Sequence, residues 1–121
     1  MSGKLDRVIL ETGSGVSLRG GNYTKAACRA VDDAIHHSSL SFMRELGMDP
    51  DAGMTVEVTI GVQDPSAVDA EAVKAMLPHG EASVRVVKGG LNVPYPERGY
   101  VTIIASAAVA AFADLSRFKG S

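Results

Sequence analysis

The stretch Glu11-Thr12-Gly13-Ser14-Gly15-Val16-Ser17-Leu18-Arg19-Gly20-Gly21 follows the apolar run Val8-Ile9-Leu10 and precedes a helix start at Thr24. This order predicts a strand, a glycine-rich turn and a helix N-terminus. Backbone N–H groups converge on anions at such turns, and glycine lets the backbone approach a ligand closely. We therefore expect a ligand-binding loop over 11–21. A plain strand-to-helix connection explains the same residues, and the loop alone does not separate the two interpretations.

One helix with a continuation is expected in the first half of the chain. The helix runs from Thr24, as its N-cap, through about His37. Its apolar positions form one stripe of mostly methyl-sized side chains, which are Ala26, Ala27, Ala30, Val31, Ala34 and Ile35. Ser38 or Ser39 caps a continuation over 41–46 that Gly47 ends.

The strands are expected from β-branched and alternating runs. Residues 54–62 alternate cleanly, with apolar side chains at even positions, and 5–11 and 82–87 are rich in β-branched residues. Asp69 can cap a short helix through about Leu77, and 91–98 holds two prolines and is predicted to be a loop. The segment 100–112 suits a strand or a helix, and its β-branched start favours a strand.

These elements predict one α/β (α+β) domain over 1–121, with a single four-stranded sheet, two main helices packed on it and the order β-α-β-α-β-β. Aromatic residues are scarce at 5% and Trp is absent, so the core must consist of Val, Ile, Leu, Met and Ala. Small core residues bury little area each. We therefore expect the chain to complete its core by forming a homo-oligomer.

Composition excludes several classes of partner. A net charge of −2 with scattered Lys and Arg gives no basic patch for nucleic acid. No apolar stretch is long enough to span a membrane, and charges within the first ten residues exclude a signal peptide. The single Cys28 forms no internal disulfide, which is typical of a cytoplasmic protein.

No strong catalytic, nucleotide or metal motif is present, so no metal or other cofactor is predicted. His36-His37 suits a helix C-terminus better than a metal, because adjacent helical side chains point about 100° apart. Cys28 has no activating partner visible in the sequence and is expected to be a small packing residue.

Two polar residues stand at strand ends, where they could meet. Lys88 precedes Gly89-Gly90, and a lysine there could bind an anion or be a solvated side chain before a turn. Glu11 ends the first predicted strand. If neighbouring strands bring Glu11 and Lys88 to one rim, the two could act as an acid–base pair.

The segments 13–20, 23–27, 34–40 and 87–91 together resemble a family of small bacterial conserved hypothetical proteins of about this length. The element order and the two glycine turns are also similar to one repeat of the cyanuric acid hydrolase and barbiturase family. Those ring-opening amidohydrolases have three similar domains around a pseudo-threefold axis, each with a Lys near its first strand and a Ser before a Gly-Gly pair. Here Lys88 stands in place of that Ser, and Leu10 and Glu11 in place of that Lys.

The resemblance implies a trimer, or a multiple of one, with small-molecule sites at strand ends or subunit interfaces. Hydrolysis or tautomerisation of a small cyclic amide or carbonyl compound is the reaction it suggests, with Lys88 stabilising negative charge and Glu11 moving a proton. The expected ligand-binding residues are Gly13, Ser14, Gly15, Arg19, Gly20, Gly89 and Gly90. A non-catalytic protein that binds a small anion or acts as a scaffold is the alternative, and a purely structural role is a third.

Overall fold

A computed structural model describes residues 6–19, 21–36, 55–77 and 81–113, and within these ranges five strands form one mixed sheet. The elements in chain order are β1 (Asp6–Ser17), α1 (Tyr23–His36), β2 (Thr55–Val62), the 3-10 helix η1 (Pro65–Ala67), α3 (Ala70–Lys74), β3 (Glu81–Lys88), β4 (Leu91–Tyr95) and β5 (Tyr100–Ala113). The fold class is therefore α+β, and α1 is the one long α-helix of the described ranges.

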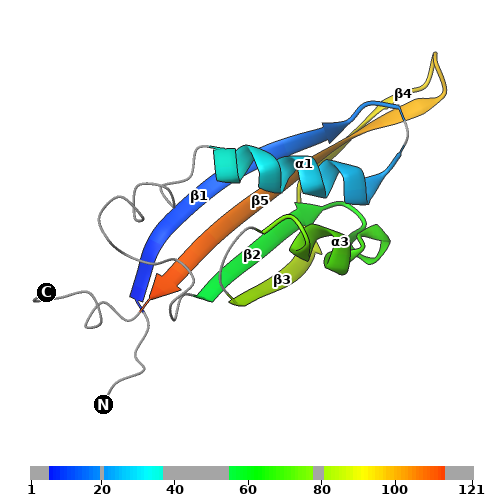
Figure 1. Cartoon of the computed structure of the whole chain (residues 1–121). Coiled ribbons are helices and arrows are strands. Elements are labelled where there is room, and N and C mark those ends of the chain that lie inside the picture. The colour runs from blue at the N-terminus through cyan, green and yellow to red at the C-terminus, as the bar shows by residue number, and fades with distance from the viewer. Residues whose placement is uncertain (1–5, 20, 37–54, 78–80, 114–121) are drawn as a thin grey trace, which may run out of the picture.

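The sheet has the order β1-β5-β2-β3, with β2 and β3 parallel and the other pairs antiparallel. The long strand β5 pairs with β4 through its first residues and with β2 through its later ones. Consequently β4 and β2 follow one another along the same edge of β5. The β4–β5 hairpin projects beyond the rest of the sheet as an arm (Figure 1).

Both α-helices pack on one face of this sheet (Figure 1). Side chains alternate between the two faces of a strand, so every second residue of β2 and β5 meets the helices. The buried core consists of Ala26, Ala27, Ala30, Val31, Ala34, Val56, Val58, Ile60, Val62, Val73, Ile103, Ala105, Ala107, Val109 and Ala111. No helix of the described ranges covers the opposite side, which we call the open face.

The first strand is longer than predicted, because the glycine-rich segment is part of it. β1 continues through Gly13 and Gly15 to Ser17, paired with β5. A Cβ at Gly13 would overlap backbone atoms of Ala30 and Ala34, and a Cβ at Gly15 would overlap those of Ala26 and Ala30. The two glycines thus allow α1 to lie directly on the backbone of β1. The predicted loop begins only after Ser17.

The prediction of a loop over 91–98 is wrong for its first five residues, which form β4, so the predicted count of four strands is one too low. Pro94 pairs with Val101 within this strand. Proline is compatible with an edge strand, since its missing N–H can face away from the neighbouring strand. The four residues after Tyr95 form the turn to β5.

The predicted helix over 24–37 is confirmed as α1, but its cap is Asn22 and not Thr24. The Asn22 Oδ1 accepts a hydrogen bond from the Lys25 backbone N–H at 3.0 Å. The Thr24 hydroxyl instead accepts from the Asp69 backbone N–H at 2.9 Å, which joins α1 to the segment before α3.

The remaining predicted elements have mixed outcomes. The strands expected over 54–62, 82–87 and 100–112 are confirmed as β2, β3 and β5. Asp69 caps α3 as predicted, because its carboxylate accepts from the N–H groups of Glu71 and Ala72. The helix expected over 41–46 lies outside the described residues.

Candidate functional site

The open face has small side chains at its centre, and the register of the sheet aligns them across the three strands β1, β5 and β2, with larger side chains on β3. Two cross-strand rows result, Ser14–Ser106–Gly61–Val87 and Thr12–Ala108–Thr59–Arg85. The bulkier Leu10 and Phe112 stand on the same face farther along β1 and β5. A difference in side-chain size therefore produces a depression in the middle of the face.

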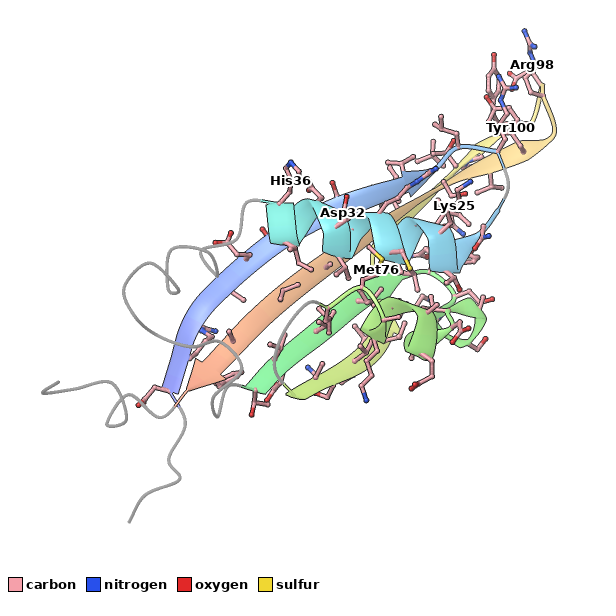
Figure 2. All side chains as sticks on the ribbon, viewed as in Figure 1. Lys25, Asp32, His36, Met76, Arg98 and Tyr100 are labelled. Atoms are coloured by element: carbon pink, nitrogen blue, oxygen red, sulfur yellow. The ribbon has the colours of Figure 1, made fainter. Side chains whose placement is uncertain are left out.

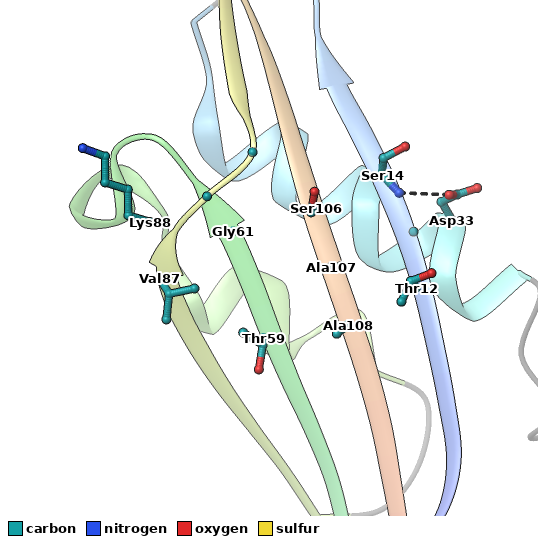
Figure 3. A pocket seen from close by; sticks show the side chains of 13 residues that line it. Thr12, Ser14, Asp33, Thr59, Gly61, Val87, Lys88, Ser106, Ala107 and Ala108 are labelled. Carbon is teal, nitrogen blue, oxygen red and sulfur yellow. Dashed lines mark hydrogen bonds between the residues drawn. The ribbon is translucent and has the colours of Figure 1, made fainter.

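This depression is a hollow of about 720 Å³, which we call the open-face hollow. It is lined by Thr12, Gly13, Ser14, Asp33, Thr59, Gly61, Val87, Lys88, Gly89, Gly90, Ser106, Ala107 and Ala108. The hydroxyl groups come from three adjacent strands, β1, β5 and β2 (Figure 3). Each hydroxyl can donate and accept a hydrogen bond, so the floor suits a ligand with carbonyl or hydroxyl groups.

Gly89 and Gly90 form the upper rim of the hollow, where the chain crosses from β3 to β4. Gly90 has φ of 63°, and a Cβ there would overlap the carbonyl oxygens of Ile104 and Gly61. The Gln63 amide donates to the carbonyls of Gly89 and Gly90 at 3.1 and 3.2 Å. Both carbonyls are thus held by Gln63, and the glycine pair serves the tight crossing past the end of β2.

Lys88 supplies the positive charge nearest to this rim. Its side chain is exposed, and it forms no hydrogen bond or ion pair within the described ranges. Figure 3 shows the ammonium group extending away from the hydroxyls of the hollow, beyond the edge of β3. Lys88 pairs with the buried Val62, so alternation along β3 places its side chain on the side of the sheet that carries the helices. The side chain is exposed at the end of the strand, and its rotamers are free to turn toward the rim.

The edge of β1 is occupied by polar side chains from α1. The Ser14 backbone N–H donates to the Asp33 carboxylate at 3.0 Å (Figure 3), and the Arg29 guanidinium donates to the Val16 carbonyl at 2.6 Å. These bonds use a donor and an acceptor that an edge strand would otherwise offer to another strand. Asp33 also closes the β1 side of the hollow with a carboxylate.

The predicted site residues divide into two groups. Gly13, Ser14, Lys88, Gly89 and Gly90 all line the open-face hollow, although Gly13 and Lys88 lie 75 positions apart in the sequence. Glu11, Gly15 and Arg19 do not line it. Gly20 lies outside the described residues.

Glu11 and Lys88 do not meet within one chain. Glu11 pairs with Val109, and alternation along β1 places it on the face that carries the helices. Three strand-to-strand spacings separate β1 from β3, which amounts to roughly 14 Å across the sheet. An acid–base pair of these two side chains would therefore require Glu11 from another copy of the chain.

Thr59 and Ser106 line the hollow but were not expected to do so from the sequence, and Thr12 lies within the predicted 11–21 segment without having been singled out. Each lies in a strand, at a position that alternation assigns to the face opposite the core. The run of small residues at alternate positions of β5 is the signal that indicates a depression there.

The remaining residues that the sequence analysis considered for chemistry are Cys28, His36 and His37. Burial raises the pKa of the Cys28 thiol above its ordinary value, and the Asp69 carboxylate raises it further. His36 lies in the last turn of α1, and His37 lies outside the described residues. In the described part of the chain, no three His, Cys, Asp or Glu side chains are grouped to hold a metal ion.

The described helices include none that is both long and apolar enough to cross a membrane.

Comparison with curated proteins gives no match. The crystal structure of an FtsZ-like protein of unknown function from Nostoc punctiforme is 33% identical in sequence, with a TM-score of 0.77. The match covers 91% of this chain and 97% of that chain. A family model described as a conserved hypothetical protein, Lin0512, matches residues 7–111, which confirms the predicted relation to a conserved hypothetical family. This chain therefore belongs to the conserved hypothetical Lin0512 family, whose function is not established.

Proposed function

We propose that this protein is a homo-oligomer that binds a small polar molecule in the open-face hollow. The observation that carries the proposal is the hollow itself. It joins the hydroxyls of Thr12, Ser14 and Ser106 on one side to the Lys88-Gly89-Gly90 segment on the other. A concave site with a few polar groups on a mainly small-residue floor is the usual form of a small-molecule site.

Exposed apolar side chains support the oligomer. Leu10 and Val87 are 48% and 37% exposed on the open face. On and beside the β4–β5 arm, Leu18, Leu91 and Val93 are 64%, 60% and 48% exposed. Apolar groups gathered on one face and one arm are typical of surfaces that another copy covers. The similarity to the three-domain amidohydrolases favours a trimer or a multiple of one.

The ligand class follows from the groups around the hollow. Hydroxyls on the floor can hydrogen-bond to carbonyl oxygens and ring N–H groups, and Lys88 can pair with negative charge at the rim. Asp33 adds a carboxylate on the β1 side, where it can accept from a ligand N–H. A small cyclic amide or carbonyl compound meets all three requirements.

Binding is the part of this proposal that the geometry supports best. Catalysis would add Lys88 as the group that stabilises developing negative charge and Glu11 of another copy as the group that moves a proton. In the alternative, non-catalytic proposal, the same hollow holds a small anion without turnover and Glu11 has no part in binding.

The experiment uses barbiturate and cyanurate as probes, with binding followed by amide NMR shifts of the full chain. We expect saturable shifts at Thr12, Ser14, Thr59 and Gly61. Ser106→Leu fills the floor and should abolish them, whereas Ser83→Leu adds the same group to the open face outside the hollow and should not. Unchanged binding in both Ser106→Leu and Lys88→Ala would overturn the proposal.

A hydrolysis assay on the same probes separates the two versions. Loss of turnover but not of binding in Glu11→Gln supports the enzyme. Binding without turnover in the unaltered chain supports the non-catalytic protein.

A further inference from the structure

A second cavity lies at the far end of the β4–β5 arm, away from the open-face hollow. It has a volume of about 440 Å³ and is lined by Arg19, Tyr95, Arg98 and Tyr100. We call these four residues the tip cluster. Figure 2 shows Arg98 and Tyr100 together at the end of the hairpin. None of these four residues lines the open-face hollow.

The hairpin turn fixes three members of the cluster. Tyr95 and Tyr100 are directly opposed across the two strands, and their rings meet edge to face with centroids 5.6 Å apart. The backbone N–H groups of Arg98 and Gly99 both donate to the Tyr95 carbonyl, at 3.0 and 2.9 Å. Gly99 has φ of 73°, which closes the turn and sets Arg98 beside the rings.

The fourth member, Arg19, is far from the other three in the sequence. Arg19 follows β1, and the Thr102 hydroxyl donates to the Leu18 carbonyl at 3.2 Å, which holds this segment against β5. The Arg19 guanidinium carbon lies 5.8 Å from the centroid of the Tyr100 ring. A cation at this distance over a tyrosine face is attracted by the ring quadrupole.

The cluster carries two positive charges without a matching carboxylate. Among the residues that the structure describes, no Asp or Glu lines the cavity, and Glu97 of the turn is the acidic residue adjacent to Arg98 in sequence. Neither guanidinium forms an ion pair within the described ranges. Two guanidinium groups at one cavity repel each other, and an anion between them removes that repulsion.

We propose that the tip cluster binds a small organic anion, a carboxylate attached to a flat apolar group. The guanidinium fork matches the two oxygens of a carboxylate, which it can bind through two parallel hydrogen bonds. The tyrosine rings form an apolar wall against which a planar group can stack. This site shares no residue with the open-face hollow, so its test does not depend on the outcome for the proposed function.

The test measures binding of benzoate, acetate and inorganic phosphate to the full chain by NMR, using the side-chain N–H signals of Arg19 and Arg98. We expect saturable binding of benzoate that is several-fold tighter than that of acetate or phosphate, because only benzoate has a ring to stack. Arg19→Gln and Arg98→Gln should each weaken benzoate binding about tenfold, as the loss of a charged hydrogen bond predicts.

Arg85→Gln is the matched control, because Arg85 is an exposed arginine on β3 that lies outside both cavities. It removes the same charge and should leave benzoate binding unchanged. Equal weakening by Arg85→Gln and Arg98→Gln would overturn the site, since the effect would then be one of net charge. Equal binding of the three probes, or no saturable binding, would overturn it as well.

Discussion

The backbone of Gly13 lies against the backbone of Ala30, so close that a methyl group on Gly13 would overlap the Ala30 carbonyl oxygen. This contact fixes the distance between β1 and α1. Gly13→Ala should therefore destabilise the protein by about 2 kcal/mol, the usual cost of adding a methyl group to a packed contact. Urea unfolding measures the change. In an unstrained strand the same substitution would stabilise the protein through the entropy of the unfolded chain.

Ser14→Ala is the control for this substitution. Ser14 is adjacent in β1 and exposed on the open face, and its hydrogen bond to Asp33 comes from the backbone. We expect a change of less than about 0.5 kcal/mol, as for most surface substitutions. If the two variants unfold at the same urea concentration, the contact between β1 and α1 is not as close as described.

The crossing from β3 to β4 should depend on glycine at position 90. Gly90 and Gly21 have similar positive φ values of 63° and 58°, but only Gly90 has backbone atoms where a Cβ would lie. Gly21→Ala should cost about 1 kcal/mol for the left-handed conformation alone. Gly90→Ala should cost clearly more, and urea unfolding of both variants measures the difference. Equal costs would show that the crossing has room for a side chain.

Asp33 should protect the edge of β1 from solvent. Its carboxylate accepts from the Ser14 N–H, so Asp33→Ala should speed hydrogen exchange of the Ser14 amide. Asp32→Ala is the control, because Asp32 is exposed on the same helix turn and forms no hydrogen bond within the described ranges. Unchanged exchange at Ser14 in Asp33→Ala would contradict the assigned role of this carboxylate.

Cys28 should react slowly at neutral pH. Burial and the charge of Asp69 raise the pKa of its thiol, so the thiolate forms only at higher pH than in glutathione. Its reaction with a disulfide reagent should be slower than that of glutathione at pH 8 and increase as the pH rises further.

The raised pKa also fixes the sign of the effect on stability. The contribution of the Cys28 thiol is fully present below the pKa of the unfolded chain, and it is lost as the pH rises through the folded pKa. Cys28→Ala should therefore weaken the decline of stability at alkaline pH. Faster reaction of Cys28 than of glutathione at neutral pH would contradict this description.

The sequence predicts those elements whose secondary structure follows from the hydrophobic pattern within their own segment. The alternation of β2 and the alanine stripe of α1 depend on which face is buried, and both are visible in one segment. The extension of β1 could not be predicted, because Gly13 and Gly15 look like loop residues until α1 is seen to lie on them. β4 was missed because Pro94 is typical of a loop unless the strand is known to be at an edge.

The candidate site was predictable in part for a similar reason. Lys88-Gly89-Gly90 is recognisable in the sequence as a short motif. The reason for its glycines is the crossing from β3 to β4 close to Gly61 and Ile104, and these contacts exist only in the folded chain. Ser106 and Thr59 come together only through the register of β5 with β2, which the sequence does not specify. Arg19 was expected at the glycine-rich segment, and it lies instead beside Tyr100 at the end of the arm.

The mass of the protein in solution tests the central claim most directly, because the proposed function makes this protein a homo-oligomer whose exposed apolar side chains lie against another copy. Sedimentation velocity of the full chain at micromolar concentration should give a multiple of the 12.6 kDa chain mass, with three copies as the expected unit. Ser106→Leu should change this mass only if another copy lies on the hollow. A monomer at all concentrations would contradict the account.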